Sequence, residues 1–113
     1  MSLIIEKSPP FHADVTNQFG WYFDEAGEEI AWRFFNSVDL TLLKLSHLPD
    51  LGRQRRFRNP ELQGLWSFQV AAPFHRFLIS YRVTSGALQA WRLMHGARDL
   101  PRRLTEPPGS SAD

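Results

Sequence analysis

The sequence predicts an α+β domain, in which an N-terminal strand and an antiparallel helical hairpin pack on a three- to four-stranded antiparallel sheet. Apolar residues recur at the 3.6-residue period of helices in the first half of the chain, and at the two-residue period of strands in residues 65–94. The 113 residues are 42% hydrophobic, which is enough for one core. We therefore expect one domain over residues 1–104 and a disordered tail over 105–113, which has no apolar residue able to anchor it.

The first elements are a short strand and two helices. Apolar residues 3–5 are expected to form the opening strand. Ser8 can cap the next helix and Pro9 fits its first turn, where a missing N–H costs nothing. That helix is expected to end at Ala26 and Gly27, and a second one is expected over about residues 28–47. Because so short a connection joins them, the two helices should lie antiparallel.

The rest of the domain is expected to be a meander of three strands. A basic loop rich in Pro and Gly occupies residues 49–60. Alternating apolar residues then predict strands over 65–70 and 77–83. Thr84-Ser85-Gly86 is a hairpin turn signal, and a third strand should cover 87–94. Tyr81 lies on the alternating face and is expected in the core.

The charges are divided unevenly along the chain. Residues 1–50 carry a net charge of −5, whereas residues 51–113 carry +6, and all ten positive charges in the second part are arginines, with no lysine. Such a distribution is typical either of a solvated face or of a surface that binds nucleic acid or an acidic protein segment. The charge alone does not decide between these two interpretations.

Several classes of site are not expected. The chain has no cysteine, which excludes disulfides and thiolate metal sites, and its four histidines are isolated in sequence. We found no glycine-rich phosphate loop, so no metal and no cofactor is expected. No apolar stretch approaches the roughly 20 residues that a membrane-spanning helix needs, and we expect a cytoplasmic protein without a membrane partner.

Four segments resemble ParE-type toxins of the RelE/ParE superfamily, which includes plasmid stabilisation proteins and belongs to type II toxin–antitoxin systems. The segments are residues 52–55, 64–70, 77–83 and 93–101. The most specific is His-Gly-Ala-Arg-Asp-Leu-Pro at 95–101, preceded by a strand that contains Tyr-Arg-Val at 81–83. The resemblance covers nearly the whole chain, and it implies a small toxin that a cognate antitoxin neutralises.

The resemblance also implies where the antitoxin binds. In this family the C-terminal segment of the antitoxin wraps the toxin and lays apolar side chains on the helical hairpin. Helical periodicity predicts two core stripes, which are Phe11, Val15, Phe19 and Tyr22 on the first helix and Ile30, Phe34, Val38, Leu42 and Leu45 on the second. Trp21, Phe23, Trp32 and Phe35 lie beside these stripes and are our candidate antitoxin-binding residues. The alternative is that all four are buried in an aromatic core. An exposed sheet edge could also accept a strand of the partner.

The superfamily contains two activities. RelE-like members cleave mRNA on the ribosome, whereas ParE-like members bind DNA gyrase, trap its cleaved DNA complex and arrest growth. This chain has Leu104 where a RelE-like enzyme carries its tail Tyr, and Ala71-Ala72 where another cation is placed. Leucine cannot transfer a proton. We therefore expect a gyrase inhibitor rather than an enzyme.

Two alternatives remain open. His95, three residues before Arg98, could support a RelE-like mRNA endonuclease, with Arg98 binding phosphate; His75 is a further candidate proton-transfer residue. The toxin could also have decayed into a non-toxic partner of the antitoxin.

For the inhibitor, the candidate target-binding residues are arginines in two groups, whose charge would complement gyrase or its bound DNA. They are Arg53, Arg55, Arg56 and Arg58 in the loop, and Arg92, Arg98, Arg102 and Arg103 near the C-terminus. Trp91 and Leu100 could add apolar anchors, although a core position is favoured for Trp91.

Overall fold

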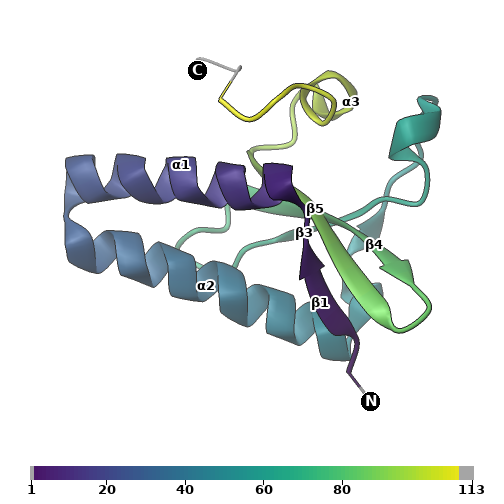
Figure 1. Ribbon diagram of the computed structural model, residues 1–113, viewed down its shortest axis with the longest axis horizontal. Coiled ribbons are helices and arrows are strands. Elements are labelled where there is room, and N and C mark those ends of the chain that lie inside the picture. Colours follow the sequence, from purple (N-terminus) through teal and green to yellow (C-terminus); the bar gives the residue numbers. More distant parts are fainter. Residues whose placement is uncertain (1, 110–113) are drawn as a thin grey trace.

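The computed structural model describes residues 2–109 (Figure 1). Its helices are α1 (Pro9–Ala26), α2 (Glu28–His47) and α3 (Leu100–Arg103), with two short 3-10 helices at Pro49–Leu51 and Pro60–Leu62. Its strands are β1 (Ile4–Lys7), β2 (Arg53–Gln54), β3 (Trp66–Gln69), β4 (Phe77–Thr84) and β5 (Ala87–His95). The predicted order of strand, two helices and meander is confirmed.

The helical hairpin begins and ends as its sequence predicts. The Ser8 hydroxyl accepts a hydrogen bond from Phe11 N–H at 3.1 Å, and therefore caps α1. The same hydroxyl donates to the Trp91 carbonyl at 2.8 Å, which ties the start of α1 to β5. Gly27 joins the helices at a φ of 95°, a conformation that side-chain-bearing residues rarely adopt. α1 and α2 then run side by side in opposite directions (Figure 1).

The sheet confirms the α+β fold class but differs from the prediction in two details. It has five strands in the order β1-β5-β4-β3-β2, and β1 pairs with β5 in parallel, with Ile4 opposite Ala87. The helical hairpin separates β1 from the meander, so no tight turn forces an antiparallel pair. β2 lies within residues 49–60, which the sequence predicts to be a loop, and it pairs antiparallel with β3. A strand of two residues is too short to show an alternating pattern in the sequence.

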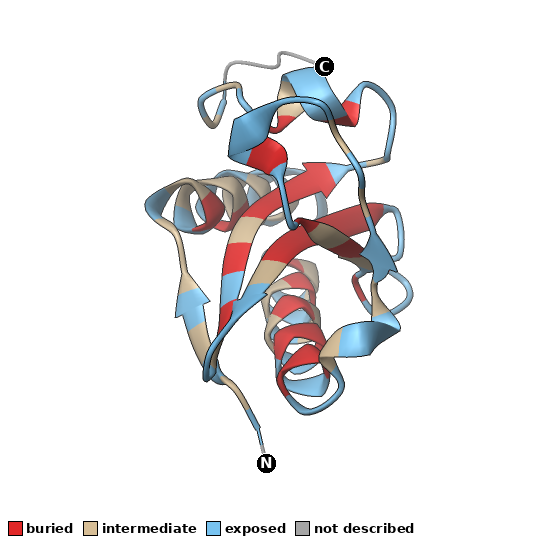
Figure 2. Ribbon diagram, turned by 90° about the vertical axis from the view of Figure 1, so that its right-hand side faces the viewer, coloured by how far each residue is buried: buried red, intermediate tan, exposed pale blue. Residues whose placement is uncertain are grey.

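Both faces of the sheet are covered, so its central strands are the most buried part of the molecule (Figure 2). On one face, α1 and α2 pack on β4 and β5 through a core that includes Phe11, Phe34 and Ile79. On the other face lies a second core, in which Phe57 and Trp91 pack at the margin. Its buried residues are Leu62, Leu65, Leu78, Met94, Leu100 and Leu104.

The C-terminal segment continues from α3. Thr105 and Glu106 donate their backbone N–H groups to the carbonyls of Arg102 and Arg103, at 3.3 and 3.2 Å. Residues 110–113 of the expected disordered tail lie outside the described residues. Within residues 2–109, no helix is both long and apolar enough to cross a membrane.

Candidate partner-binding surfaces

Four aromatic side chains gather on one flank of the helical hairpin, and we name them the hairpin aromatic cluster: Phe19, Phe23, Trp32 and Phe35. The Phe19 and Trp32 ring centroids lie 4.9 Å apart with the rings edge to face, a favourable geometry. Phe23 and Trp32 remain 48% and 49% exposed. Such large apolar area outside a core is typical of an interaction site.

Helical geometry explains the cluster. Phe19 and Phe23 are one turn apart on α1, and Trp32 and Phe35 are one turn apart on α2, so each pair shares a face of its helix. Phe19 links the two pairs. The sequence pattern placed Phe19 in the apolar stripe of its helix, which is why it was not among the candidate binding residues.

Trp21 lies apart from the cluster. Trp21 and Phe23 are two residues apart, which corresponds to about 200° around a helix, so the two side chains lie on opposite flanks of α1. The Trp21 and Tyr22 ring centroids lie 5.4 Å apart, and the Trp21 side chain is 56% exposed. It lines a groove of about 560 Å³ between α1, the end of β5 and the C-terminal segment. The structure therefore brings together only three of the four predicted antitoxin-binding residues.

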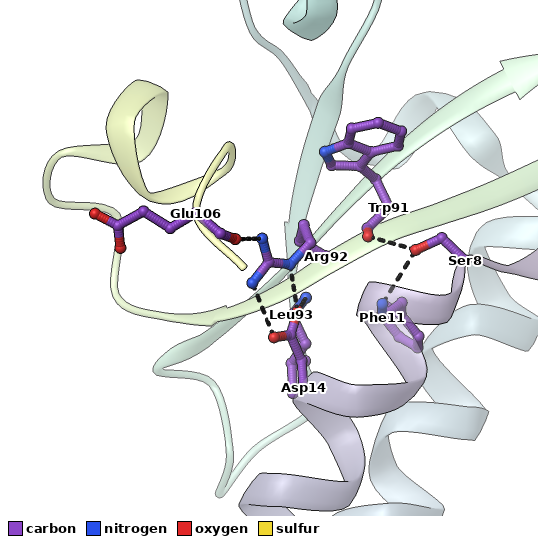
Figure 3. A network of polar contacts seen from close by, with 7 residues as sticks. All are labelled: Ser8, Phe11, Asp14, Trp91, Arg92, Leu93 and Glu106. Carbon is purple, nitrogen blue, oxygen red and sulfur yellow. Dashed lines mark hydrogen bonds and ion pairs between the residues drawn. The ribbon is translucent and has the colours of Figure 1, made fainter. Parts of the chain in front are cut away.

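Arg92 is buried, which contradicts the expectation that it lies on an exposed basic surface (Figure 3). Its Nε and Nη2 donate to the two carboxylate oxygens of Asp14, at 2.7 and 3.0 Å. Its Nη1 donates to the Glu106 carbonyl. Asp14 also accepts from the backbone N–H of Leu93 at 3.0 Å, since β1 no longer pairs with β5 at that point. Arg92 thus joins α1, β5 and the C-terminal segment.

The four arginines predicted to lie in the loop after the hairpin differ in exposure. Arg53, Arg56 and Arg58 are exposed. Arg55 is half-buried and donates its Nε to the Ser67 hydroxyl at 2.8 Å, which holds the loop on β3. Burial lowers the pKa of the Arg55 guanidinium, and the charge of Arg53 lowers it further. Three arginines of this loop are therefore free to meet a partner.

The C-terminal arginines surround the turn after β5. Arg98 and Arg102 are exposed, and Arg102 pairs with Asp99 at 3.9 Å and with Glu106. Arg103 instead donates to the carbonyls of His95 and Arg98, at 2.8 and 2.9 Å, and so stabilises the turn.

The two groups of arginines lie in one layer of the molecule, which is built on the second core and covers the face of the sheet away from the helical hairpin. Phe57, between Arg56 and Arg58, packs on the same second core as Leu100 and Leu104 of the C-terminal region. Leu100 is therefore a buried core residue, and Trp91 is half-buried against that core, with the Arg82 guanidinium over its ring at 4.6 Å. This layer places the exposed arginines on the side of the sheet away from the hairpin.

The end of β5 offers few groups for proton transfer. His95 is exposed, and its ring lies edge to face with the Phe77 ring, with 5.1 Å between the centroids. Arg98 is exposed in the turn that follows. Leu104 is 3% exposed in the second core. Tyr81 is fully buried as predicted, and burial raises the pKa of its hydroxyl to about 12. Among residues 2–109 no group of three or more His, Asp or Glu side chains could hold a metal ion.

The comparisons with known proteins identify a similar fold. No family model matches the sequence, and no curated protein matches it. A solved structure described as "Chromosomal ParDE TA system from P. aeruginosa" superposes with a TM-score of 0.68 at 17% identity. The similarity covers 85% of this chain and 98% of that chain. The chain therefore has a ParE-like fold.

Proposed function

We propose that this chain is the toxin of a type II toxin–antitoxin module, acting in the cytoplasm by binding DNA gyrase and neutralised by a cognate antitoxin. The observation that carries the proposal is the hairpin aromatic cluster, exposed on a ParE-like fold. A toxin that is normally stored as a complex needs an apolar surface for its partner, and the cluster provides one.

The antitoxin is expected to cover the cluster. Phe23 and Trp32 are half exposed on a folded domain, so their burial by a partner would add apolar contact without refolding the hairpin. Leu43, three turns after Trp32 on the same side of α2, adds further apolar surface and is 49% exposed. Trp21 faces another groove and is not part of this proposed site.

Gyrase is expected to bind the layer on the other side of the sheet, which is built on the second core. Exposed arginines there can complement an acidic partner and speed its encounter. They are Arg53, Arg56, Arg58, Arg98 and Arg102. The Leu104 side chain has no ionisable group, and the Tyr81 hydroxyl is buried and donates to the Pro49 carbonyl, so neither can act as an acid or base on a substrate. This favours obstruction of gyrase over cleavage of RNA.

One observation favours a second candidate, a ribosome-dependent mRNA endonuclease. His95 and Arg98 are both exposed at the end of β5, three residues apart, where an imidazole and a guanidinium could act on one phosphodiester. The nuclease would still need a second proton-transfer group, which a substrate or the ribosome would have to supply.

Two reactions test the proposal side by side. Purified toxin added to gyrase and supercoiled DNA should trap double-strand breaks, and it should leave mRNA on translating ribosomes intact. Cleavage of that mRNA without any effect on gyrase would replace the proposal by the nuclease. Expression without growth arrest, with antitoxin binding preserved, would show a decayed toxin.

A further inference from the structure

A groove of about 570 Å³ lies between the start of α1, β5 and the C-terminal segment, beside the groove that Trp21 lines. Its walls are mostly apolar, and we name it the proline groove because four of its lining residues are prolines. Its apolar lining is Pro9, Pro10, Trp91, Leu104, Pro107 and Pro108. Proline side chains are rigid, so these walls lose little conformational entropy when a ligand binds.

A bulge in β5 sets the position of Trp91 in this groove. Arg92 and Ala90 lie opposite successive residues of β4, and Trp91 between them has no partner on that strand. The Ser8 hydroxyl, which donates to the Trp91 carbonyl, holds the bulge against the start of α1. Bulges re-aim side chains and are frequent beside binding sites, so an irregular feature of the sheet directs this tryptophan.

The indole of Trp91 carries a free hydrogen-bond donor. Its Nε1 is the one buried side-chain nitrogen or oxygen of residues 2–109 that has no hydrogen-bond partner. Figure 3 shows this nitrogen on the edge of the ring that faces the C-terminal segment, which forms the other wall of the groove. The Arg82 guanidinium lies over the ring and restrains it. Because a buried N–H without a partner is costly, the groove suits a ligand that brings an acceptor.

The other polar side chains along β5 and the C-terminal segment of the groove are already paired. The Ser8 hydroxyl caps α1, and the Arg92 guanidinium is bonded to Asp14. The Thr105 hydroxyl donates to a backbone carbonyl, and the Glu106 carboxylate is in an ion pair. This part of the groove therefore offers a ligand one hydrogen-bond donor among apolar walls.

One carboxylate borders the groove without a counter-charge. Glu61 is exposed, and within residues 2–109 its side chain forms no ion pair. Arg82 directs its N–H groups to the backbone carbonyls of Glu61 and Gln63, and not to this carboxylate. Because Arg82 also lies over Trp91, it fixes Glu61 beside the indole. A positive charge on the ligand would complement this end of the groove.

These features select an extended segment that contains proline. The interior carbonyls of a helix are already hydrogen-bonded, so none is free for the indole. A strand brings N–H groups, which apolar walls would leave without acceptors. Proline lacks the N–H, and in the polyproline II conformation the backbone carbonyls stay free. Such a segment can give a carbonyl to the indole and lay its rings on the apolar walls.

We propose that the proline groove binds an extended, proline-rich segment of a partner protein, with a lysine or arginine next to the prolines. Trp91 donates its indole N–H to a carbonyl of the segment, and Glu61 pairs with the basic residue. The site shares no residue with the hairpin aromatic cluster, so this inference does not rest on the proposed function.

The probes are two synthetic peptides with the same charge: hexaproline with an arginine at each end, and the same peptide with glycine in place of every proline. Each is titrated into the isotope-labelled protein, and the indole N–H signals of its four tryptophans are followed by NMR. Loss of one signal in Trp91→Phe identifies the Trp91 indole. The Trp21 indole is the internal control, because it lines the neighbouring groove.

The proline peptide should shift the Trp91 signal in a saturable way, to lower field as the N–H gains an acceptor, and should leave the Trp21 signal in place. The glycine peptide should bind about tenfold more weakly or worse, because it is flexible and its N–H groups lose their bonds to water. The titration of the original chain does not depend on whether any variant folds.

Two substitutions test the assigned contacts. Trp91→Phe keeps an aromatic ring but removes the donor, and should weaken binding of the proline peptide about threefold to tenfold. Trp21→Phe is its matched control and should bind normally. Glu61→Gln should weaken binding about threefold at low salt and little at high salt. Glu25→Gln, in the last turn of α1, removes the same charge far from Pro9 and should have no effect. Thermal midpoints show that each variant is folded.

Several outcomes would overturn the inference. They are the absence of a Trp91 shift at about 1 mM proline peptide, equal binding of the glycine peptide, and a shift of Trp21 in place of Trp91. Normal affinity in folded Trp91→Phe or Glu61→Gln would overturn the contact assigned to that residue. Dimerisation that shifts the Trp91 signal without peptide would show that a second copy of this chain occupies the groove, and would also overturn the inference.

Discussion

The hydroxyl of Tyr81 occupies the space that a side chain at Gly52 would need. A Cβ atom on Gly52 would lie 2.1 Å from Tyr81 Oη and 2.9 Å from the Ser67 carbonyl oxygen. The hydroxyl accepts from Gly52 N–H at 3.1 Å and donates to the Pro49 carbonyl at 2.7 Å. A core tyrosine thus fixes the loop that carries the exposed arginines, and the close approach requires glycine.

The first prediction concerns this approach. Gly52→Ala should lower the free energy of unfolding by about 1–3 kcal/mol, because either Tyr81 or the loop must move. Gly20→Ala is the matched control: its Cβ would meet nothing within 4 Å in the interior of α1, so a gain of about 0.5–1 kcal/mol is expected. Urea denaturation checks both. A loss of similar size at the two positions would contradict the proposed role of the close contact.

The second prediction concerns alkaline pH. Burial raises the Tyr81 pKa from its ordinary value of 10.0 to about 12. The neutral hydroxyl is therefore favoured by folding, and its contribution to stability is full below pH 10 and is lost as the pH rises from 10 to 12. Burial raises the pKa of Tyr22 in the same direction.

Tyr81→Phe isolates this effect. The variant should be about 1–3 kcal/mol less stable at neutral pH, because Gly52 N–H and the Pro49 carbonyl lose their partner. Its stability should then fall less steeply than that of the original chain between pH 10 and 12. Urea denaturation at each pH measures the two slopes, and parallel curves would show that another group titrates there.

The third prediction concerns the buried ion pair. Asp14→Asn should cost about 3–5 kcal/mol, because it leaves the Arg92 guanidinium buried without its counter-charge. Asp14→Leu combined with Arg92→Met should cost less than the sum of the single substitutions, since neither charge then stays unpaired. A double-mutant cycle measures this coupling. Additive losses would show that the two side chains contribute independently.

The helical hairpin and the three strands of the meander were predictable because each depends on local signals. The cap at Ser8, the break at Gly27 and the alternation along β4 are all readable within a few residues of sequence. The parallel pairing of β1 with β5 was not, because it joins segments about 80 residues apart and no local pattern encodes the choice.

The candidate sites were less predictable, for the same reason. Arg92 looked like its neighbours in an arginine-rich region, and only the fold reveals that Asp14, 78 residues earlier, faces it. The four aromatic candidates were selected for lying beside the core stripes, a criterion that does not distinguish the two flanks of α1. Trp21 was therefore grouped with Trp32 although the two face different surfaces.

That separation supports the last prediction. Trp32→Ala should weaken binding of the proposed antitoxin by about 2 kcal/mol or more, roughly 30-fold, because an aromatic anchor of the proposed interface is lost. Trp21→Ala removes an equally exposed tryptophan from the other flank of α1 and should leave the affinity within about twofold. Titration calorimetry with the protein of the neighbouring reading frame measures both affinities, and thermal unfolding verifies that both variants are folded. If Trp21→Ala causes the larger loss, the antitoxin occupies the groove between α1 and β5 instead of the hairpin aromatic cluster.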